Sequence, residues 1–353
     1  MYSIVTRRKL RRLFYGLRRN VLLLAFALWT ILVLTLNRRL SRVTSLALLP
    51  PPPPERDLTH FIRSRSLEYY LDNIELLIEP SLEPCLEDIP VIVLAASAPT
   101  RWSHREAIRR TWGKRIPTYF LMGLDGPQIN EELTNNYIEA KEYRDLIVYD
   151  FLEHYQNLTL KTALMLQWTS QRCPEARFLY KTDDDVVINP WRLKEVLIDN
   201  AHTELAGYMV NKSSVHRDEY NKWYLPRWLQ WEDIVPRYLT GPGYLIHGDH
   251  ISKLLEGAYK VPLYNLEDVY FTYSVANVTL RYNLTHDSRL CPFKPWVSWF
   301  GCAYFRQASI HSLTANEIVK IYWKVEDIGK IYEYDKNVCG FYERYLDRFV
   351  FWY

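Results

Sequence analysis

The stretch Arg177-Phe-Leu-Tyr-Lys-Thr-Asp-Asp-Asp-Val-Val-Ile-Asn-Pro190 decides the fold that we expect for this chain. Its apolar residues at 178–180 predict a buried strand, and those at 186–188 predict a second, short one. Three adjacent carboxylates between two buried segments repel one another unless a cation neutralises them. Oxygen ligands suit Mg²⁺ or Mn²⁺, which often bind through one or two carboxylates together with substrate phosphates. A solvated acidic turn is the alternative; the flanking strand and the helix start at Asn189-Pro190 favour a metal site.

Strands and helices alternate along the chain before the acidic triplet. The continuous apolar run at 89–97 is typical of a central parallel strand that is covered on both faces. The further predicted elements are strands at 118–123 and 145–151 and helices at 103–113, 131–143 and 160–171. This alternation predicts an α/β sheet with a nucleotide-binding half, in which ligands gather at the carboxyl ends of the strands. The acidic triplet lies at such an end.

Two arginines are candidate nucleotide-binding residues. Arg105 and Arg109 lie one turn apart on the helix predicted at 103–113, close to its start. Guanidinium groups and helix N-termini both bind phosphate, so this position suits a diphosphate or a nucleotide. A solvated basic face is the alternative.

The second half of the chain is rich in aromatic residues and glycine. Trp223 belongs to a segment dense in indole rings, which suit the apolar face and hydroxyl rim of a sugar, although core packing is the commoner use of tryptophan. Gly241 and Gly243 follow and let the backbone approach a ligand closely. These three residues are candidate substrate-binding residues.

An acidic pair and a histidine complete the candidate site. Glu267 and Asp268 precede an apolar helical run, where the helix dipole stabilises the charged carboxylates. Asp268 is the candidate general base, and a helix cap is the alternative. His311 ends a predicted short strand before a helix capped at Thr314, and it is a candidate metal ligand; a lone histidine is more often structural.

Composition bounds the class of protein. The chain has 353 residues, of which 48% are hydrophobic and 24% charged, so it is globular. Its formal net charge is only +3, and the basic residues crowd the first twenty positions, so no nucleic-acid partner is expected.

The N-terminal part predicts a membrane anchor. Residues 21–36 carry no charge and are nearly long enough to span a thin membrane. A cleaved signal peptide is the alternative, but no small-residue cleavage site follows. Seven basic residues precede the run and three follow it, which predicts a single-pass type II orientation. We therefore predict a cytoplasmic tail at 1–20, a signal-anchor at 21–36, a lumenal stem at 37–87 and a catalytic domain at 88–353.

Sequons and cysteines agree with a lumenal location. The four sequons start at Asn157, Asn211, Asn277 and Asn283. The five cysteines fit no zinc pattern. Cys291 and Cys302 are close enough in sequence for a disulfide that closes a short loop. Because the number of cysteines is odd, at least one thiol is free or pairs with another chain, so a homodimer is possible.

Several ordered motifs resemble those of glycosyltransferase family 31, which holds β-1,3-galactosyltransferases and β-1,3-N-acetylglucosaminyltransferases. The resemblance covers roughly residues 88–323. The motifs are Arg105-Glu-Ala-Ile-Arg-Arg-Thr-Trp112, Asp150-Phe151, Tyr155-Gln-Asn-Leu-Thr-Leu-Lys-Thr162, Lys181-Thr-Asp-Asp-Asp-Val186, Gly241-Pro-Gly-Tyr244 and Glu267-Asp-Val269.

The resemblance implies a GT-A nucleotide-sugar transferase fold, a UDP-hexose donor, Mn²⁺ and inversion at the anomeric carbon. It implies that Asp183 and Asp184 contact the donor, that Asp185 and His311 bind the metal, and that Asp268 is the base, with Glu267 orienting the acceptor. It also implies a Golgi membrane enzyme that acts on a glycan of a glycoprotein or glycolipid. Galactose is the favoured sugar, with N-acetylglucosamine and N-acetylgalactosamine as alternatives.

Two other classes of protein remain as rivals. A glycoside hydrolase also uses two carboxylates but needs no nucleotide or metal. A non-catalytic lumenal chaperone or lectin on the same scaffold has no need of the acidic triplet or the Glu267-Asp268 pair.

Overall fold

The computed structural model describes residues 20–33, 63–80, 85, 90–125, 129–295 and 300–346, and the chain divides into two compact units, Met1–Leu58 and Thr59–Tyr353. In the first unit the described residues 20–33 form a helix. Within the described ranges no helix has both the length and the apolar character needed to cross a membrane. The predicted tail, the end of the predicted anchor and the proline-rich part of the stem lie outside the described residues.

The second unit is built on an eight-stranded mixed sheet in the order β1-β4-β3-β2-β5-β8-β7-β9. Strands β4, β3, β2 and β5 are mutually parallel. Strand β1 runs antiparallel to β4, β8 runs antiparallel to both β5 and β7, and β9 is parallel to β7. A separate two-stranded sheet joins β6 and β10. The strands are β1 (Leu76–Ile78), β2 (Ile92–Ala96), β3 (Thr118–Leu124), β4 (Leu146–Leu152), β5 (Phe178–Asp183), β6 (Val187–Ile188), β7 (Leu205–Ser214), β8 (Ile234–His247), β9 (Leu284–His286) and β10 (Ser309–Ile310).

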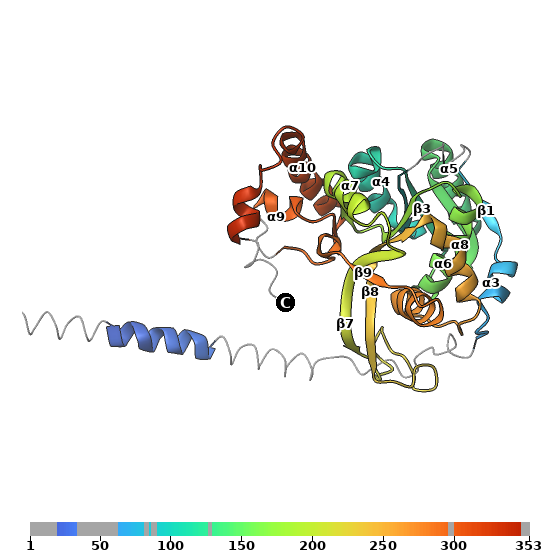
Figure 1. Cartoon of the computed structure of the whole chain (residues 1–353), viewed down its shortest axis with the longest axis horizontal. Helices are drawn as coiled ribbons and strands as arrows, with labels where there is room; N and C mark the ends of the chain where they lie inside the picture. Colours follow the sequence, from blue (N-terminus) through green and yellow to red (C-terminus); the bar gives the residue numbers. More distant parts are fainter. Residues whose placement is uncertain are drawn as a thin grey trace, which may run out of the picture. The chain divides into compact units, whose positions relative to one another are not determined.

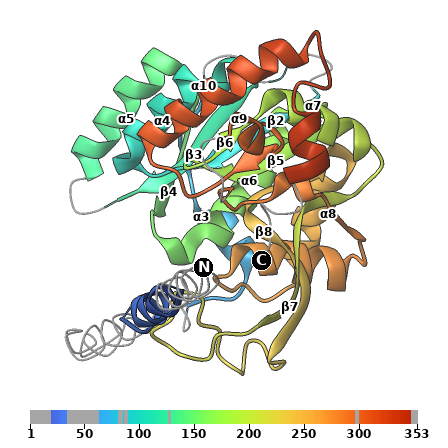
Figure 2. The ribbon, with the colours of Figure 1, turned by 90° about the vertical axis from the view of Figure 1, so that its left-hand side faces the viewer.

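Helices cover both faces of the sheet, and each face has its own core. Along β2, Ile92, Leu94 and Ala96 face the core that contains α6 and α8, while Val93 and Ala95 face the core that contains α4, α7 and α10. Figure 1 shows the two helical layers, and Figure 2 shows α4 and α10 side by side over the sheet. The helices are α3 (Leu67–Asn73), α4 (Trp102–Arg110), α5 (Ile129–Tyr143), α6 (Leu158–Arg172), α7 (Pro190–Asp199), α8 (Gly248–Ala258), α9 (Gly301–Phe305), α10 (Ala315–Tyr332) and the π-helical η4 (Val269–Thr279); short 3₁₀ turns include η1 (Pro99–Arg101) and η3 (Tyr155–Asn157).

The predicted α/β class is confirmed, and the predicted strands and helices before the triplet agree with β2 to β5 and α4 to α6 within a few residues. The sheet is parallel only up to β5. Beyond it, the antiparallel β8 pairs with β5 and brings Gly243 opposite Thr182. This change of direction places the second half of the chain beside the acidic triplet.

The predicted domain start at residue 88 is too late. Leu67 of α3 is fully buried in the main core, and β1 pairs with β4 as an edge strand. Cys85 forms a disulfide with Cys173 at the end of α6. Residues 63–80, which we expected in the stem, therefore belong to the folded unit because they bury apolar surface against it.

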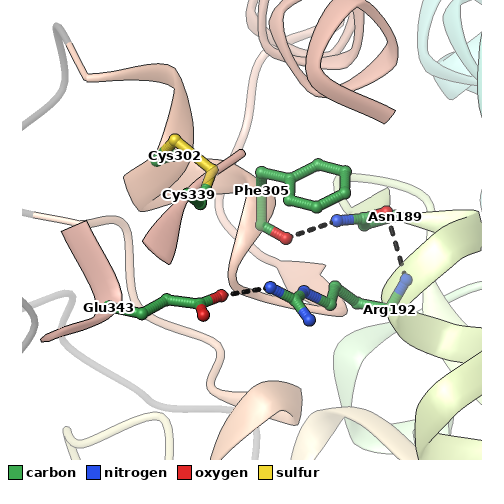
Figure 3. The surroundings of a disulfide bond; sticks show 6 residues. All are labelled: Asn189, Arg192, Cys302, Phe305, Cys339 and Glu343. Atoms are coloured by element: carbon green, nitrogen blue, oxygen red, sulfur yellow. Dashed lines mark hydrogen bonds and ion pairs between the residues drawn. A yellow bond between two sulfur atoms is a disulfide. The ribbon is translucent and has the colours of Figure 1, made fainter. Parts of the chain in front are cut away.

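The predicted disulfide between Cys291 and Cys302 is wrong. Cys302 instead pairs with Cys339, which fastens α9 to the segment after α10 (Figure 3). Close by, the carbonyl of Phe305 accepts a hydrogen bond from the Asn189 side chain. Cys291 is a free thiol and is buried, so it offers no accessible sulfur for a covalent homodimer; the homodimer itself stays a prediction.

Candidate active site

The acidic triplet lies at the carboxyl end of β5, as its position in the sequence predicts. Ala96 at the end of β2 is the register partner of Asp183, so the ends of two central parallel strands meet here. The turn that follows is fixed by two backbone hydrogen bonds. Asp184 N–H donates to the carbonyl of Ala96 (3.1 Å), and Leu313 N–H donates to the carbonyl of Asp185 (3.0 Å).

Three side chains form a cluster suited to a metal ion: Asp183, Asp185 and His311. Pairing of β10 with β6 carries His311 to the turn, where its Nε2 lies 3.3 Å from Asp185 Oδ1 and 4.0 Å from Asp183 Oδ2. One ligand atom from each residue lies within 4.8 Å of the others. Asp185 Oδ1 is buried and has no hydrogen-bond partner, as expected of an oxygen that a cation would satisfy. Burial, together with the charges of Asp183 and Asp184, raises the pKa of Asp185 against the lowering effect of His311.

Asp184 has a different environment from its two neighbours. Only 4% of it is exposed, and its carboxylate accepts hydrogen bonds from Ser97 Oγ (2.7 Å) and from the Arg101 guanidinium (2.6 Å for the shortest contact). Both oxygens of Asp184 thus bind protein groups that line the site, and the donor contact that the resemblance implied for Asp184 stays a prediction. Arg101 escaped the sequence analysis because the helix was expected to begin two residues later; no local signal separates it from the arginines that follow.

The guanidinium groups of Arg105 and Arg109 bind protein partners in this structure. All five N–H groups of the fully buried Arg105 are used, on Glu139, Ser97 Oγ and two backbone carbonyls. Arg109 pairs with Glu139 and Asp145 at 2.7 Å. Their predicted role is corrected: they hold α4 against α5 and β4, and Arg105 orients the serine that binds Asp184.

Asp268 lies across the site, directly before η4. Its Oδ1 accepts from Val269 N–H (2.9 Å) and its Oδ2 from Gly241 N–H (3.2 Å). Burial and the charge of Glu267 raise the pKa of Asp268 to about 6, against the lowering effects of these N–H groups and of Lys181. A carboxylate with such a pKa is ionised at neutral pH yet basic enough to accept a proton.

Glu267 is buried beside Asp268. It is 5% exposed, and its carboxylate accepts from the Tyr244 hydroxyl (2.5 Å) and from Lys181 Nζ (3.1 Å). Both of its oxygens thus bind protein groups below the surface, which does not favour the predicted acceptor contact. Its position makes it a support for the base.

Lys181 joins the two acidic groups. Its buried ammonium donates to Asp183 Oδ1 (3.2 Å), to Glu267 Oε2 (3.1 Å) and to the carbonyl of Gly241 (2.8 Å), which uses all three of its protons. Burial alone would lower its pKa, but the two carboxylates raise the pKa of Lys181 overall. The lysine is therefore a fixed positive charge between the metal cluster and the base.

Of the remaining predicted residues, Gly241 lies against Asp268. A Cβ on Gly241 would touch the carboxylates of Asp268 and Glu267 at 3.5 Å, whereas a Cβ on Gly243 would lie 2.2 Å from the Tyr180 hydroxyl. Gly243 is thus required by internal packing. Trp223 is 43% exposed in the connection between β7 and β8.

The sequons differ in accessibility. Asn157 is buried, and its amide donates to the carbonyl of Leu152 (2.8 Å), so the predicted glycosylation of Asn157 conflicts with the fold. The amide of Asn277 also binds a backbone carbonyl. Asn211 and Asn283 are exposed and stay predicted glycosylation sites.

A pocket of about 520 Å³ adjoins the turn on the other side of η1. Pro99, Thr100, Asp125 and the first two turns of α5 line it with carboxylates and amides. A more apolar pocket of about 600 Å³ lies at the opposite, amino ends of β2, β3 and β5 and has no part in the site.

The central strands of a mixed α/β sheet thus end at a metal-type cluster, and the buried carboxylates of Glu267 and Asp268 are linked to it through Lys181. Residues 103–285, more than half of the chain, match the family model described as Galactosyltransferase. The chain therefore belongs to the galactosyltransferase family, glycosyltransferase family 31, and is a hexosyltransferase.

Named relatives agree with this assignment. The chain is 29% identical to Beta-1,3-galactosyltransferase 1 of Mus musculus, over 74% of this chain and 81% of the relative. It is 31% identical to Beta-1,3-galactosyltransferase 2 of Homo sapiens, over 68% of this chain and 60% of the relative. Among solved structures, the galactosyltransferase LgtC with donor and acceptor sugar analogs has a TM-score of 0.33 at 12% identity, covering 69% of this chain and 99% of LgtC. The bifunctional glycosyltransferase WbbM has a TM-score of 0.37 at 11% identity, covering 72% of this chain and 53% of WbbM.

Proposed function

We propose that this chain is an inverting β-1,3-galactosyltransferase that moves galactose from UDP-galactose to a glycan of a glycoprotein or glycolipid. The observation that carries the proposal is the meeting of two groups: the cluster of Asp183, Asp185 and His311, and the base Asp268, with Lys181 between them. The names of the relatives support the sugar and the linkage.

Mn²⁺ is the proposed cofactor, held by Asp185 and His311 with support from Asp183. Two carboxylates and an imidazole suit this ion, and the buried, unpaired Oδ1 of Asp185 fits it. A bound Mn²⁺ supplies Lewis-acid stabilisation of the negative charge on departing UDP. The fixed turn keeps the two aspartates in place for this role, and Lys181 limits the repulsion between Asp183 and the base.

Asp268 is the proposed general base. It accepts the proton of the acceptor hydroxyl while that oxygen attacks the anomeric carbon from the face opposite UDP. Gly241 N–H and Val269 N–H hold its two oxygens, so the carboxylate keeps one orientation. The pocket beyond η1 is the proposed place of the uridine, because its carboxylates can accept hydrogen bonds from ribose hydroxyls.

The proposed location is the Golgi membrane, with a type II anchor at residues 21–36 and the catalytic unit in the lumen. The uncharged run with its flanking basic residues supports the anchor. The two disulfides support a compartment in which thiols are oxidised.

The test is release of UDP by the purified chain, with Mn²⁺ and with UDP-galactose, UDP-N-acetylglucosamine or UDP-N-acetylgalactosamine in turn. We expect turnover with UDP-galactose that requires both Mn²⁺ and a glycoside acceptor, and a β-1,3 linkage in the product. Turnover with only one of the other donors would refute the galactose assignment. Glycoside hydrolysis without nucleotide would favour a hydrolase, and no turnover with any donor would favour a lectin or chaperone.

A further inference from the structure

Two aromatic side chains from distant parts of the chain lie around the ammonium group of Lys222. Tyr155 belongs to η3, directly after β4, and Trp223 belongs to the connection between β7 and β8. Lys222 Nζ lies over both rings, 5.8 Å from the centroid of Tyr155 and 4.5 Å from that of Trp223, so the two rings lie near each other. The two residues are 41% and 43% exposed, so they present surface to solvent.

The charges of the active site act on the phenol of Tyr155. Burial, and then the charge of Asp268, raises the pKa of Tyr155 to about 12, and Asp183 and Glu267 add to the effect. Charges from both halves of the active site therefore act on one hydroxyl. Tyr155 is protonated at neutral pH and can donate a hydrogen bond there.

The support of Tyr155 is rigid. The next residue, Gln156, accepts a hydrogen bond on its side chain from Asn265 (2.5 Å) and one on its carbonyl from Arg63 (3.0 Å). These contacts tie η3 to the segment that leads into Glu267-Asp268. The distance from Tyr155 to the base is therefore set by the fold.

The support of Trp223 is equally well built. Its backbone N–H donates to the Asn221 side chain (2.8 Å), and its ring packs against the ring of His216, with 5.4 Å between the centroids. Arg217 crosses the connection and donates to the carbonyls of Leu225 (2.7 Å) and Gln230 (2.8 Å). An exposed loop with so many internal hydrogen bonds holds its indole in one place.

We infer that Tyr155 and Trp223 form the subsite for the acceptor sugar, a pyranoside that packs its apolar face on the rings and receives a hydrogen bond from the Tyr155 hydroxyl. The inference rests on the proposed function and deepens it. Aromatic rings with a polar edge match a sugar, which has one apolar face and a hydroxyl rim. Lys222 Nζ lies 4.5 Å from the Trp223 ring centroid and 5.8 Å from that of Tyr155, and adds a donor for the acceptor hydroxyls. A sugar on this platform presents a hydroxyl to Asp268.

The same loop offers a matched control. Trp231 is 78% exposed and lies in the same connection. Its side chain has no polar contact with the site among the described residues, so it tests for general effects of removing an exposed indole.

The experiment compares Trp223→Ala, Tyr155→Phe and Tyr155→Ala with the wild type and with Trp231→Ala, all as the full chain. Steady-state kinetics with UDP-galactose, Mn²⁺ and p-nitrophenyl β-N-acetylglucosaminide or β-galactoside give separate KM values for donor and acceptor. We expect the acceptor KM to rise about tenfold or more in Trp223→Ala and Tyr155→Ala, and less in Tyr155→Phe, which keeps the ring. The donor KM and the affinity for UDP should stay unchanged, and Trp231→Ala should match the wild type.

The outcomes separate this inference from the proposed function. Normal turnover with an unchanged acceptor KM in both alanine variants refutes the subsite and leaves the function intact. A donor KM that rises as much as the acceptor KM in these variants has the same meaning. Acceptor binding is also measured directly, by calorimetry with UDP and Mn²⁺ present. Binding that depends on Trp223 and Tyr155, without transfer from any donor, supports the subsite and refutes the function. If neither glycoside binds the wild type, the subsite is refuted.

Discussion

Replacing Asp268 by asparagine isolates the proton-transfer step. The amide keeps the shape of the side chain and can still accept from either Val269 N–H or Gly241 N–H, but not from both. The lost hydrogen bond costs about 1 kcal/mol. The substitution also removes a buried negative charge beside Glu267, which offsets this cost, so the free energy of unfolding should change little. General-base catalysis contributes roughly 10²–10⁴ in rate, or about 3–5 kcal/mol of barrier. We expect kcat to fall by that factor while UDP binding is kept.

The assay follows UDP release with saturating Mn²⁺, and calorimetry measures UDP affinity. The pH profile adds a second readout. Because the base form exists only above the raised pKa of about 6, wild-type kcat/KM should fall as pH drops below about 6, and Asp268→Asn should lack this limb. Asp327→Asn, which alters an exposed carboxylate on α10, is the control and should behave as the wild type. Activity within tenfold of the wild type, or an equal loss of UDP binding, would refute the role of Asp268.

Three further predictions test the surroundings of the site. Asp185→Ala should raise the Mn²⁺ concentration needed for UDP binding by more than about tenfold, since mutating even the residues that support metal ligands typically lowers metal affinity by about 10–100-fold. Calorimetric titration with Mn²⁺ checks this, and an unchanged Mn²⁺ requirement contradicts the metal assignment. Cys339→Ser opens the bond to Cys302, which spans 37 residues, and should lower the unfolding free energy by roughly 4 kcal/mol in urea, more than Cys291→Ser, which breaks no bond. Asn157 should carry no glycan in peptide mass spectra, and a glycopeptide that contains Asn157 would contradict its burial. Asn157→Gln should unfold at a lower urea concentration because the buried amide loses its hydrogen-bond partners.

The sequence was sufficient for the features that depend on local pattern. The apolar runs of β2 and β5 and the periodic helices between them follow directly from residue spacing, and so does the position of the triplet at a strand end. The same holds for the helix after His311, whose capping box joins Thr314 and Glu317.

The sequence was insufficient where partners lie far apart along the chain. Arg105 looked like a phosphate ligand because its counterion, Glu139, lies on another helix. Cys302 was matched with its near neighbour, although the fold brings Cys339 closer. Lys181 was part of a recognised motif but was given no role, because its role exists only once β8 brings Gly241 alongside β5.

The pairing of β10 with β6 has a consequence for the order in which the enzyme is made. Asp183 and Asp185 emerge from the ribosome well before His311, which reaches them only after β10 has added to β6. Until then a nascent chain holds two of the three cluster residues, and its segment after α10 cannot yet join Cys302. The metal-type cluster is thus completed by a segment far downstream of β5, so a chain shortened before residue 309 would lack a finished cluster even with every residue of β5 in place.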